Sequence, residues 1–259
     1  MIHDYYYTFD LPIPYKKLLI HPVKIRDYHE FIYYSSCLTL EKNSIKDPTL
    51  AIKAITMTYF QYMMEVSNQE NNMIALFDAL LRLVLNKKEE VCEIQYGRLK
   101  DGKPFFEIDG EVYDTKDFDE IRKIICDQNL LDLPDESIQK DVRDKMEEAR
   151  KFKQKINGSK IASFEEQLLA LSLYSGIELE KIHQMSFRKF MMAIKRANHM
   201  IMSNIYLTAS MSGFVTFKDK SVLKGWLADI SDYDKNKDVL MSIESVQNKI
   251  NMEDAKNKK

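Results

Sequence analysis

The sequence has few residues that interrupt helices and no excess of charge of one sign. Its 259 residues include only 7 glycines and 6 prolines, and 45 % of them are hydrophobic. Scarce helix breakers and apolar residues at helical spacing predict a mainly α fold with a small antiparallel β insert, an α+β class with a multi-helix C-terminal domain. The chain is long enough to bury a sizeable core.

The charge balance and the cysteines exclude several classes of protein. The formal net charge of −2 gives no broad positive field for nucleic acid or anionic membrane, so any basic surface must be local. Cys37, Cys92 and Cys126 are far apart and form no CxxC pair, which argues against a disulfide framework or a zinc site. With no secretory signal at the N-terminus, we expect a protein of a reducing cytoplasm.

One uncharged run is long enough to cross a bilayer. Residues 197–217 are 21 residues without a formal charge, but they include Asn198, His199, Asn204 and Gly213. Such polar groups would need partners in hydrocarbon, whereas a buried helix can supply them. We therefore expect this run to form the central core helix.

Motifs for catalysis and metal binding are missing. The five histidines show no i, i+4 pair, and no serine lies in a nucleophile-elbow sequence. The run from Asp232 to Asp238 resembles a calcium loop, but Lys237 and Ile243 replace the glycine and glutamate that the loop needs. We expect no enzyme, no metal and no cofactor.

The chain divides into five expected parts. Pro12, Pro14 and Pro22 lie among aromatic and branched residues and predict a hairpin or extended arm over 5–23, followed by helices at 25–38, 48–66 and 71–85. The expected domains are a β-arm plus helical unit (1–88), an acidic ββα-like insert (89–136), a charged connecting helix (137–160), an all-helical C-terminal domain (161–252) and a disordered tail (253–259). The helices expected in the C-terminal domain are 163–175, 178–185, 186–211, 219–230 and 234–252.

The insert is predicted from its turns and its charge. Asp101-Gly102 and Asp109-Gly110 flank KPFFEI, the pattern of a short strand meander, and a helix follows at 117–129. Residues 101–136 hold twelve acidic and four basic side chains, a net of −8, so this lobe would repel phosphate.

Two surfaces are candidates for binding a partner. The connecting helix has a narrow apolar stripe that includes Val142 and Met146, which suits a helix lying along another surface. The second is a basic stripe on the helix at 186–211, formed by Arg188, Lys189, Lys195 and Arg196 at i, i+7 spacing. This stripe is either a solvated face or a site for phosphate or for an acidic protein surface, including the acidic lobe of a neighbouring copy.

A possible DNA-reading motif precedes this stripe. The stretch SLYSGIELEKIHQMSFRKF (172–190) resembles a helix-turn-helix, but its second helix follows Glu178 and Glu180 and offers only Lys181, His183 and Gln184 to base edges. We expect a packed helical corner, with Gly176 ending one helix. A helix-turn-helix-type DNA-binding regulator stays open as the alternative.

Three segments carry a more specific resemblance: DFDEIRKIICDQNLLDLPDE (117–136), FEEQLLALSLYSGIELEKIHQMSFRKF (164–190) and IYLTASMSGFVTFKDKSVLKGWL (205–227). They resemble proteins of the tail gene cluster of contractile-tailed bacteriophages, the group of tail assembly chaperones and baseplate hub assembly proteins. The shared pattern is a helix ending in small-Gly-apolar, a short helix ending in Met, and a longer helix after an aromatic residue.

The resemblance implies a non-enzymatic protein that binds other tail proteins, such as the tape measure or baseplate hub proteins. It implies action in the host cytoplasm during assembly, or a place in the virion tail. The charge pattern allows a homo-oligomer as well, in which the basic stripe meets the acidic lobe of a neighbouring copy. We expect the N-terminal arm and the helix at 137–156 to contact the partner, and Trp226 to anchor the C-terminal core.

Overall fold

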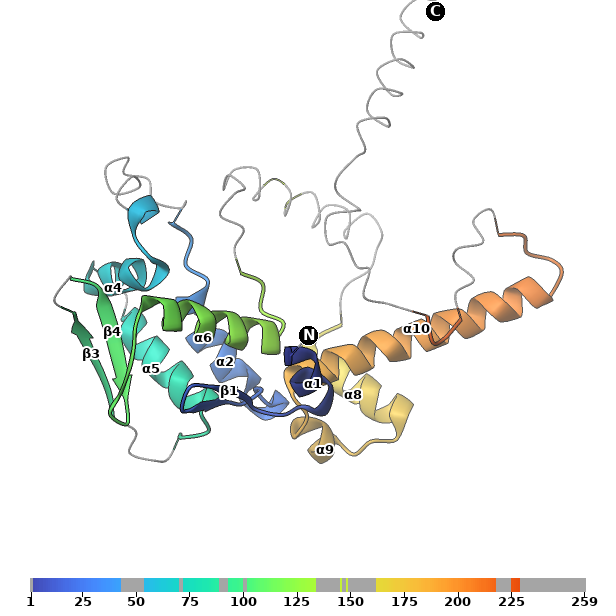
Figure 1. The fold of residues 1–259 in the computed structure, drawn as a ribbon. Coiled ribbons are helices and arrows are strands. Elements are labelled where there is room, and N and C mark those ends of the chain that lie inside the picture. Colours follow the sequence, from blue (N-terminus) through green and yellow to red (C-terminus); the bar gives the residue numbers. More distant parts are fainter. Residues whose placement is uncertain are drawn as a thin grey trace, which may run out of the picture. The chain divides into compact units, whose positions relative to one another are not determined.

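The structure is a computed structural model that describes residues 2–42, 54–69, 72–88, 93–99, 102–133, 145, 148, 162–217 and 225–228. The chain forms two units, one of Met1–Ile138 and Phe164–Ala197, the other of Gln139–Ser163 and Asn198–Lys259. The described elements, with η for 3-10 helices, are α1 (Ile2–Phe9), β1 (Ile13–Tyr15), β2 (Leu18–Ile20), η1 (Ile25–Asp27), α2 (Tyr28–Tyr34), η2 (Ser35–Leu38), α4 (Tyr59–Gln69), α5 (Met73–Val84), β3 (Ile94–Arg98), β4 (Pro104–Ile108), β5 (Glu111–Tyr113), α6 (Thr115–Gln128), α8 (Phe164–Ser175), α9 (Leu179–His183) and α10 (Phe187–Met211) (Figure 1).

The expected fold class is confirmed, because helices predominate and the strands form two small antiparallel sheets. The strands β1 and β2 make the expected N-terminal hairpin, with Ile13 opposite Ile20. The strands β3, β4 and β5 make the expected meander in that order, with Ile94 opposite Ile108 and Phe106 opposite Tyr113. Gly97 lies under the Phe105 ring, where an added Cβ would come within 2.6 Å of a ring carbon.

Two segments differ from the prediction in where their helices begin or end. Residues 5–9, expected to be extended, belong to helix α1, which ends where Asp10 adopts a φ of +59° and Leu11 N–H donates to the Tyr6 carbonyl. The helix predicted at 48–66 is interrupted before α4. There the Thr58 hydroxyl accepts from Gln61 N–H and the Gln61 amide oxygen accepts from Thr58 N–H, which caps a new helix.

One aromatic core joins helices α4, α5 and α6 to the three-stranded sheet. Phe118 of α6 stacks on Phe60 of α4 with ring centroids 4.6 Å apart, and both rings contact Phe77 of α5 and Phe106 of β4. All four phenylalanines are fully buried. Residues from 1–88 and from 89–136 therefore contribute to the same core.

The start of α6 is tied to the N-terminal hairpin by the carboxylate of Asp117. It accepts from Tyr15 Oη at 2.8 Å, from Lys16 Nζ at 2.6 Å and from the backbone N–H of Asp114 at 2.9 Å. Asp114 in turn caps the helix by accepting from the backbone N–H groups of Lys116 and Asp117. Lys16 reaches this carboxylate from a turn in which its φ is +50°.

Side chains at the C-terminal end of α6 form hydrogen bonds with the backbone before and after the β1–β2 hairpin. The Gln128 side-chain amide donates to the carbonyls of Leu11 and Ile20, and the Asn129 side-chain oxygen accepts from Val23 N–H at 2.9 Å. Gln128 and Asn129 are 2 % and 1 % exposed. These buried side-chain amides therefore supply hydrogen-bond partners to backbone groups of the hairpin region that water does not reach.

The expectation of a central core helix at 197–217 is wrong. Helix α10 ends at Met211, and Ile201, Ile205 and Phe214 are 40, 53 and 95 % exposed. At 1.5 Å per residue the 25-residue helix is about 37 Å long. Among the described residues, the small core at the start of α10 reaches along the helix as far as Ile194, and several apolar side chains beyond it are exposed. No helix in the described ranges has the length and apolar character needed to span a membrane.

The last described stretch also differs from the expectation. Residues 225–228 form a turn in which Ala228 N–H donates to the Gly225 carbonyl, where a helix at 219–230 was predicted. Trp226 in this turn is 52 % exposed, so its side chain lies at a surface and does not anchor a core. The expected helix at 234–252 and the tail at 253–259 lie outside the described residues.

The Asp117 contacts predict an acid-sensitive contribution to stability. Burial raises the pKa of Asp117, but hydrogen bonds from Lys16, the Asp114 backbone and Tyr15 lower it more, so the net pKa lies below its usual value. Its contribution is complete above the unfolded pKa of about 3.9 and is lost as pH falls through the folded pKa. Urea unfolding from pH 6 downward will show a weaker pH dependence for Asp117→Asn than for the wild-type chain.

Asp119 on the same helix is the matched control. Burial raises the pKa of this carboxyl, so its protonation favours the folded state as pH falls. Asp119→Asn will therefore steepen the loss of stability in acid. Equal slopes for the two variants would contradict the role given to Asp117.

Candidate functional site

Helices α8, α9 and α10 form a compact corner around a second small core. This core consists of Ile25, Leu171, Ile182 and Phe190, and Ile177 and Met185 pack against it half-buried. Gly176 ends α8 with a φ of +71°, and its N–H donates to the Ser172 carbonyl at 2.8 Å. The expected packed corner is confirmed.

The corner is joined to the N-terminal part of the same unit by backbone hydrogen bonds. Ile25 N–H donates to the Met185 carbonyl and Phe187 N–H donates to the Val23 carbonyl, both at 2.9 Å. Next to them the Tyr28 ring stacks on Phe187 at 4.1 Å and on Phe164 at 5.1 Å. These contacts join segments that are far apart in the sequence, and they fix the start of α10 against residues 23–28.

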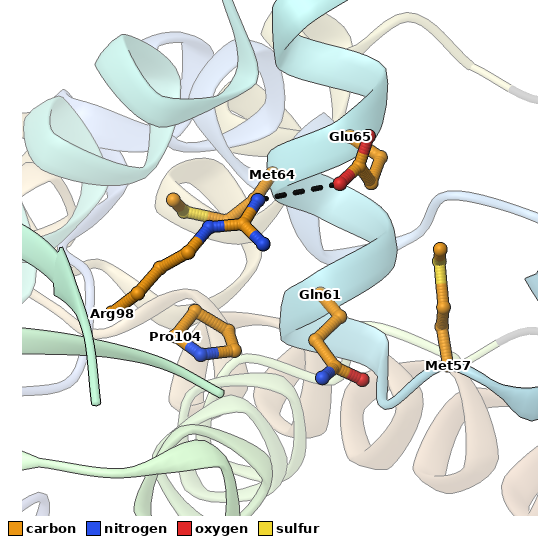
Figure 2. A pocket seen from close by; sticks show the side chains of 6 residues that line it. All are labelled: Met57, Gln61, Met64, Glu65, Arg98 and Pro104. Carbon is orange, nitrogen blue, oxygen red and sulfur yellow. Dashed lines mark hydrogen bonds and ion pairs between the residues drawn. The ribbon is translucent and has the colours of Figure 1, made fainter. Parts of the chain in front are cut away.

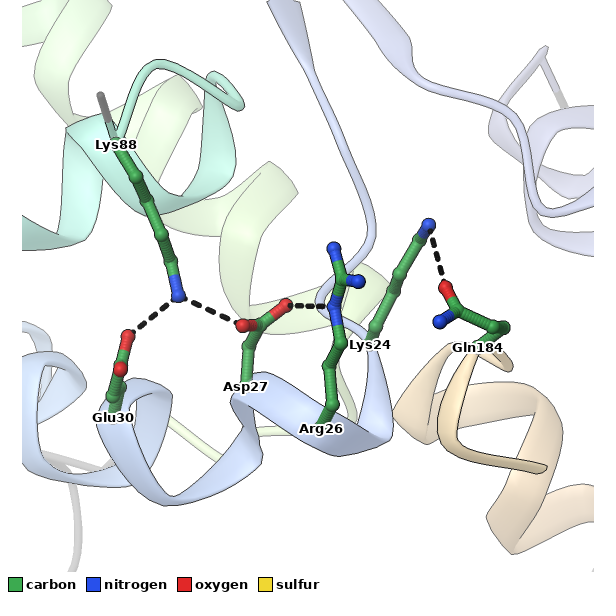
Figure 3. A network of polar contacts seen from close by, with 6 residues as sticks. All are labelled: Lys24, Arg26, Asp27, Glu30, Lys88 and Gln184. Carbon is green, nitrogen blue, oxygen red and sulfur yellow. Dashed lines mark hydrogen bonds and ion pairs between the residues drawn. The ribbon is translucent and has the colours of Figure 1, made fainter. Parts of the chain in front are cut away.

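Charged side chains surround this junction (Figure 3). Lys88 Nζ lies 2.7 Å from Asp27 and 2.6 Å from Glu30, and Asp27 also faces Arg26 at 3.4 Å. Burial lowers the pKa of Lys88, but its hydrogen bonds to Asp27 and Glu30 raise it more, so the ammonium form is favoured. These charges are engaged with one another and position the segment that carries Ile25.

The four predicted basic residues of α10 have different environments. Arg188 donates to the Asp127 carbonyl at 2.9 Å, and its guanidinium carbon lies 4.4 Å from the centroid of the Tyr7 ring. Lys189 and Lys195 are exposed, and within the described residues neither makes an ion pair. Arg196 is half-buried and has an interaction of its own. Only two of the four are therefore presented to a partner.

The other predicted partner-binding residues, Val142 and Met146, lie outside the described residues.

The helix-turn-helix alternative predicts Lys181, His183 and Gln184 as the contacts to base edges. Lys181 Nζ pairs with Glu178 at 3.0 Å, and the Gln184 side-chain oxygen accepts from Lys24 at 3.3 Å. The side chain of His183 is exposed.

Sequence reasoning missed the outer face of α8. Leu171 is buried in the corner, but Leu169, Leu173 and Tyr174 on other sides of the helix are 42, 84 and 48 % exposed. A helix with leucines on more than one face lacks the single apolar stripe of an ordinary surface helix. That missing stripe is the signal in the sequence that could have identified this face.

The second half of α10 is the other exposed apolar surface. Ile201, Ile205 and Met211 are 40, 53 and 83 % exposed on a stretch without a formal charge. Near its start, a His199 ring nitrogen lies 3.0 Å from the Gly225 carbonyl oxygen. Exposed apolar residues grouped without charges are typical of protein interaction sites.

A small cavity lies between α4 and the ends of β3 and β4 (Figure 2). It has a volume of about 90 Å³ and is lined by Met57, Gln61, Met64, Glu65, Arg98 and Pro104. An ion pair of 3.3 Å joins Glu65 to Arg98 beside it. Ligand pockets usually measure roughly 300–1,000 Å³, so this cavity is too small for a typical substrate.

The described cysteines and acidic groups also lack the features of reactive sites. Cys37 and Cys126 are buried and free, and burial raises the pKa of Cys126 to about 12, which disfavours the nucleophilic thiolate. Across the described ranges, no three His, Cys, Asp or Glu side chains gather in a way that could hold a metal ion.

No family model, curated protein or solved structure matches this chain. Its function is therefore inferred from its surface chemistry.

Arg188 and Lys189 form a matched pair for separating structure from binding. Arg188→Met will lower the free energy of unfolding by about 1–2 kcal/mol, because it removes a charged hydrogen bond and a cation–π contact. Lys189→Met removes an exposed charge and will change it by less than about 0.5 kcal/mol. Urea unfolding of both variants measures the difference, and equal effects would contradict the structural role of Arg188.

Proposed function

We propose that this protein is a non-enzymatic assembly protein of a contractile bacteriophage tail, an assembly chaperone or a baseplate hub component, which acts by binding other tail proteins. The observation that carries the proposal is the second half of α10. Ile201, Ile205 and Met211 are exposed there on an uncharged helical stretch. Such a surface suits a partner that covers apolar side chains.

Two further features of the described residues favour binding over catalysis. The cavity between α4 and the ends of β3 and β4 is too small for a typical substrate, and the buried thiol of Cys126 is held in its neutral form. The resemblance of residues 117–230 to tail-cluster proteins names the class of partner, the tape measure or baseplate hub proteins. We place the protein in the host cytoplasm during assembly, or in the virion tail.

A pull-down with the tagged full-length chain tests this proposal directly. The chain will capture the tape measure protein or a baseplate hub protein encoded with it, and Ile201→Asp with Ile205→Asp will abolish the capture, because the new charges would have to be buried without partners. The matched control is Ile32→Asp with Ile55→Asp, two isoleucines that are 45 and 71 % exposed elsewhere.

The control variant will capture the partner as the wild-type chain does. Circular dichroism of all three chains confirms that the substitutions leave the helices intact. The proposal fails when neither tail protein is captured by the wild-type chain. Loss of capture in both double variants would remove the role given to the second half of α10.

A helix-turn-helix-type DNA-binding regulator is the alternative, and the exposed Lys189 and Lys195 are the observation that favours it. The engaged side chains of Lys181 and Gln184 oppose it, because they are two of its three expected base contacts.

A gel-shift assay with duplex DNA at low salt separates the alternatives. A protein-binding function predicts no shift, because two exposed lysines alone attract phosphate weakly. Salt-dependent binding that disappears in Lys189→Glu with Lys195→Glu would support the regulator in its place.

A further inference from the structure

Two faces of the corner formed by α8, α9 and α10 are complementary in charge, and each also has exposed apolar side chains. The first, the leucine face, consists of Glu165, Leu169 and Leu173 at i, i+4 and i+8 on α8, with Tyr174 beside them. All four side chains are exposed, and Leu173 is 84 % exposed. Glu165 makes no ion pair within the described residues, so its charge is available to a partner.

The second, the lysine face, consists of Lys189, Met192 and Lys195 at i, i+3 and i+6 on α10. Met192 is 43 % exposed between the two lysines. Met is flexible enough to fit between side chains of different shapes, which suits it to a binding surface. No acidic residue occurs on α10 to neutralise these lysines from within the helix.

We infer that the leucine face of one molecule binds the lysine face of a second copy of this chain. This self-association goes beyond the proposed binding of tail proteins and uses other residues. The two faces span about 12 Å and about 9 Å, since a helix rises about 1.5 Å per residue. They therefore match in length over roughly two helical turns.

We propose the antiparallel orientation, in which Lys195 meets Glu165, Met192 lies between Leu169 and Leu173, and Lys189 lies over the Tyr174 ring. The parallel orientation would instead pair Glu165 with Lys189 and place Lys195 at the Tyr174 ring, so exchanging the charges of Glu165 and Lys195 distinguishes the two. A second copy supplies every group that this arrangement needs.

The two faces differ, so the contact is heterologous: each molecule uses one face toward one neighbour and the other face toward the next. Such contacts close into a ring or continue as a stack. The apolar area is small and exposed ion pairs stabilise a contact only weakly, so we expect reversible association that weakens as salt rises.

Sedimentation equilibrium of the full-length chain at low salt tests the inference. The average mass will rise with protein concentration. Glu165→Lys or Lys195→Glu alone will raise the dissociation constant by about tenfold, which corresponds to replacing one attraction by a repulsion. The chain with both substitutions will recover association, because the swapped charges attract each other again.

Lys123→Glu is the matched control, since it makes the same change of charge at an exposed lysine of α6. It will leave association unchanged. Leu173→Ser will weaken association without lowering the free energy of unfolding, because that side chain is exposed in the monomer.

Three results would overturn the inference: a constant monomer mass at all concentrations, failure of the double substitution to recover association, or equal weakening by Lys123→Glu. The Ile201→Asp with Ile205→Asp variant separates the two proposals. It will still self-associate while failing to capture a tail protein, so either proposal can fail without the other.

Discussion

The packing of four phenylalanine rings is the interaction on which the larger part of the first unit depends. Phe60, Phe77, Phe106 and Phe118 come from α4, α5, β4 and α6, and each contacts the other three. Aromatic rings bury a large area each and prefer stacked or edge-on contacts, so this cluster sets the position of the sheet against the helices.

Helix α6 connects that core to the corner formed by α8, α9 and the start of α10, which lies within the same unit. At its start Asp117 holds the hairpin, and at its end Asn129 accepts a hydrogen bond from Val23. The chain after Val23 then pairs with residues 185–187, so Phe187 begins α10 from a position defined by the main core. Arg188 completes the connection by contacting Tyr7 and the end of α6. A rigid support of this kind lowers the entropic cost of presenting a binding face.

The exposed faces, each within its own unit, offer two kinds of interaction. The second half of α10 is apolar and uncharged, which favours a partner with an apolar surface of its own. The leucine and lysine faces combine a few apolar side chains with opposite charges, which favours a weaker and more directional contact. Both are compatible with a protein that assembles others, and neither needs a cavity or a reactive side chain.

The sequence by itself determined the local structure. Helical periodicity, the Asp109-Gly110 turn and Gly176 identified the helices, the meander and the corner, because each depends on neighbours along the chain. The tertiary structure decided what could not be read locally. Tyr7 and Asp127, distant in sequence, engage Arg188 and leave Lys189 exposed, although both were predicted as one basic stripe. The tertiary structure also leaves Ile201 and Ile205 exposed. Whether an apolar helix face is covered depends on which other segments pack on it, and the hydropathy of the helix does not reveal those segments.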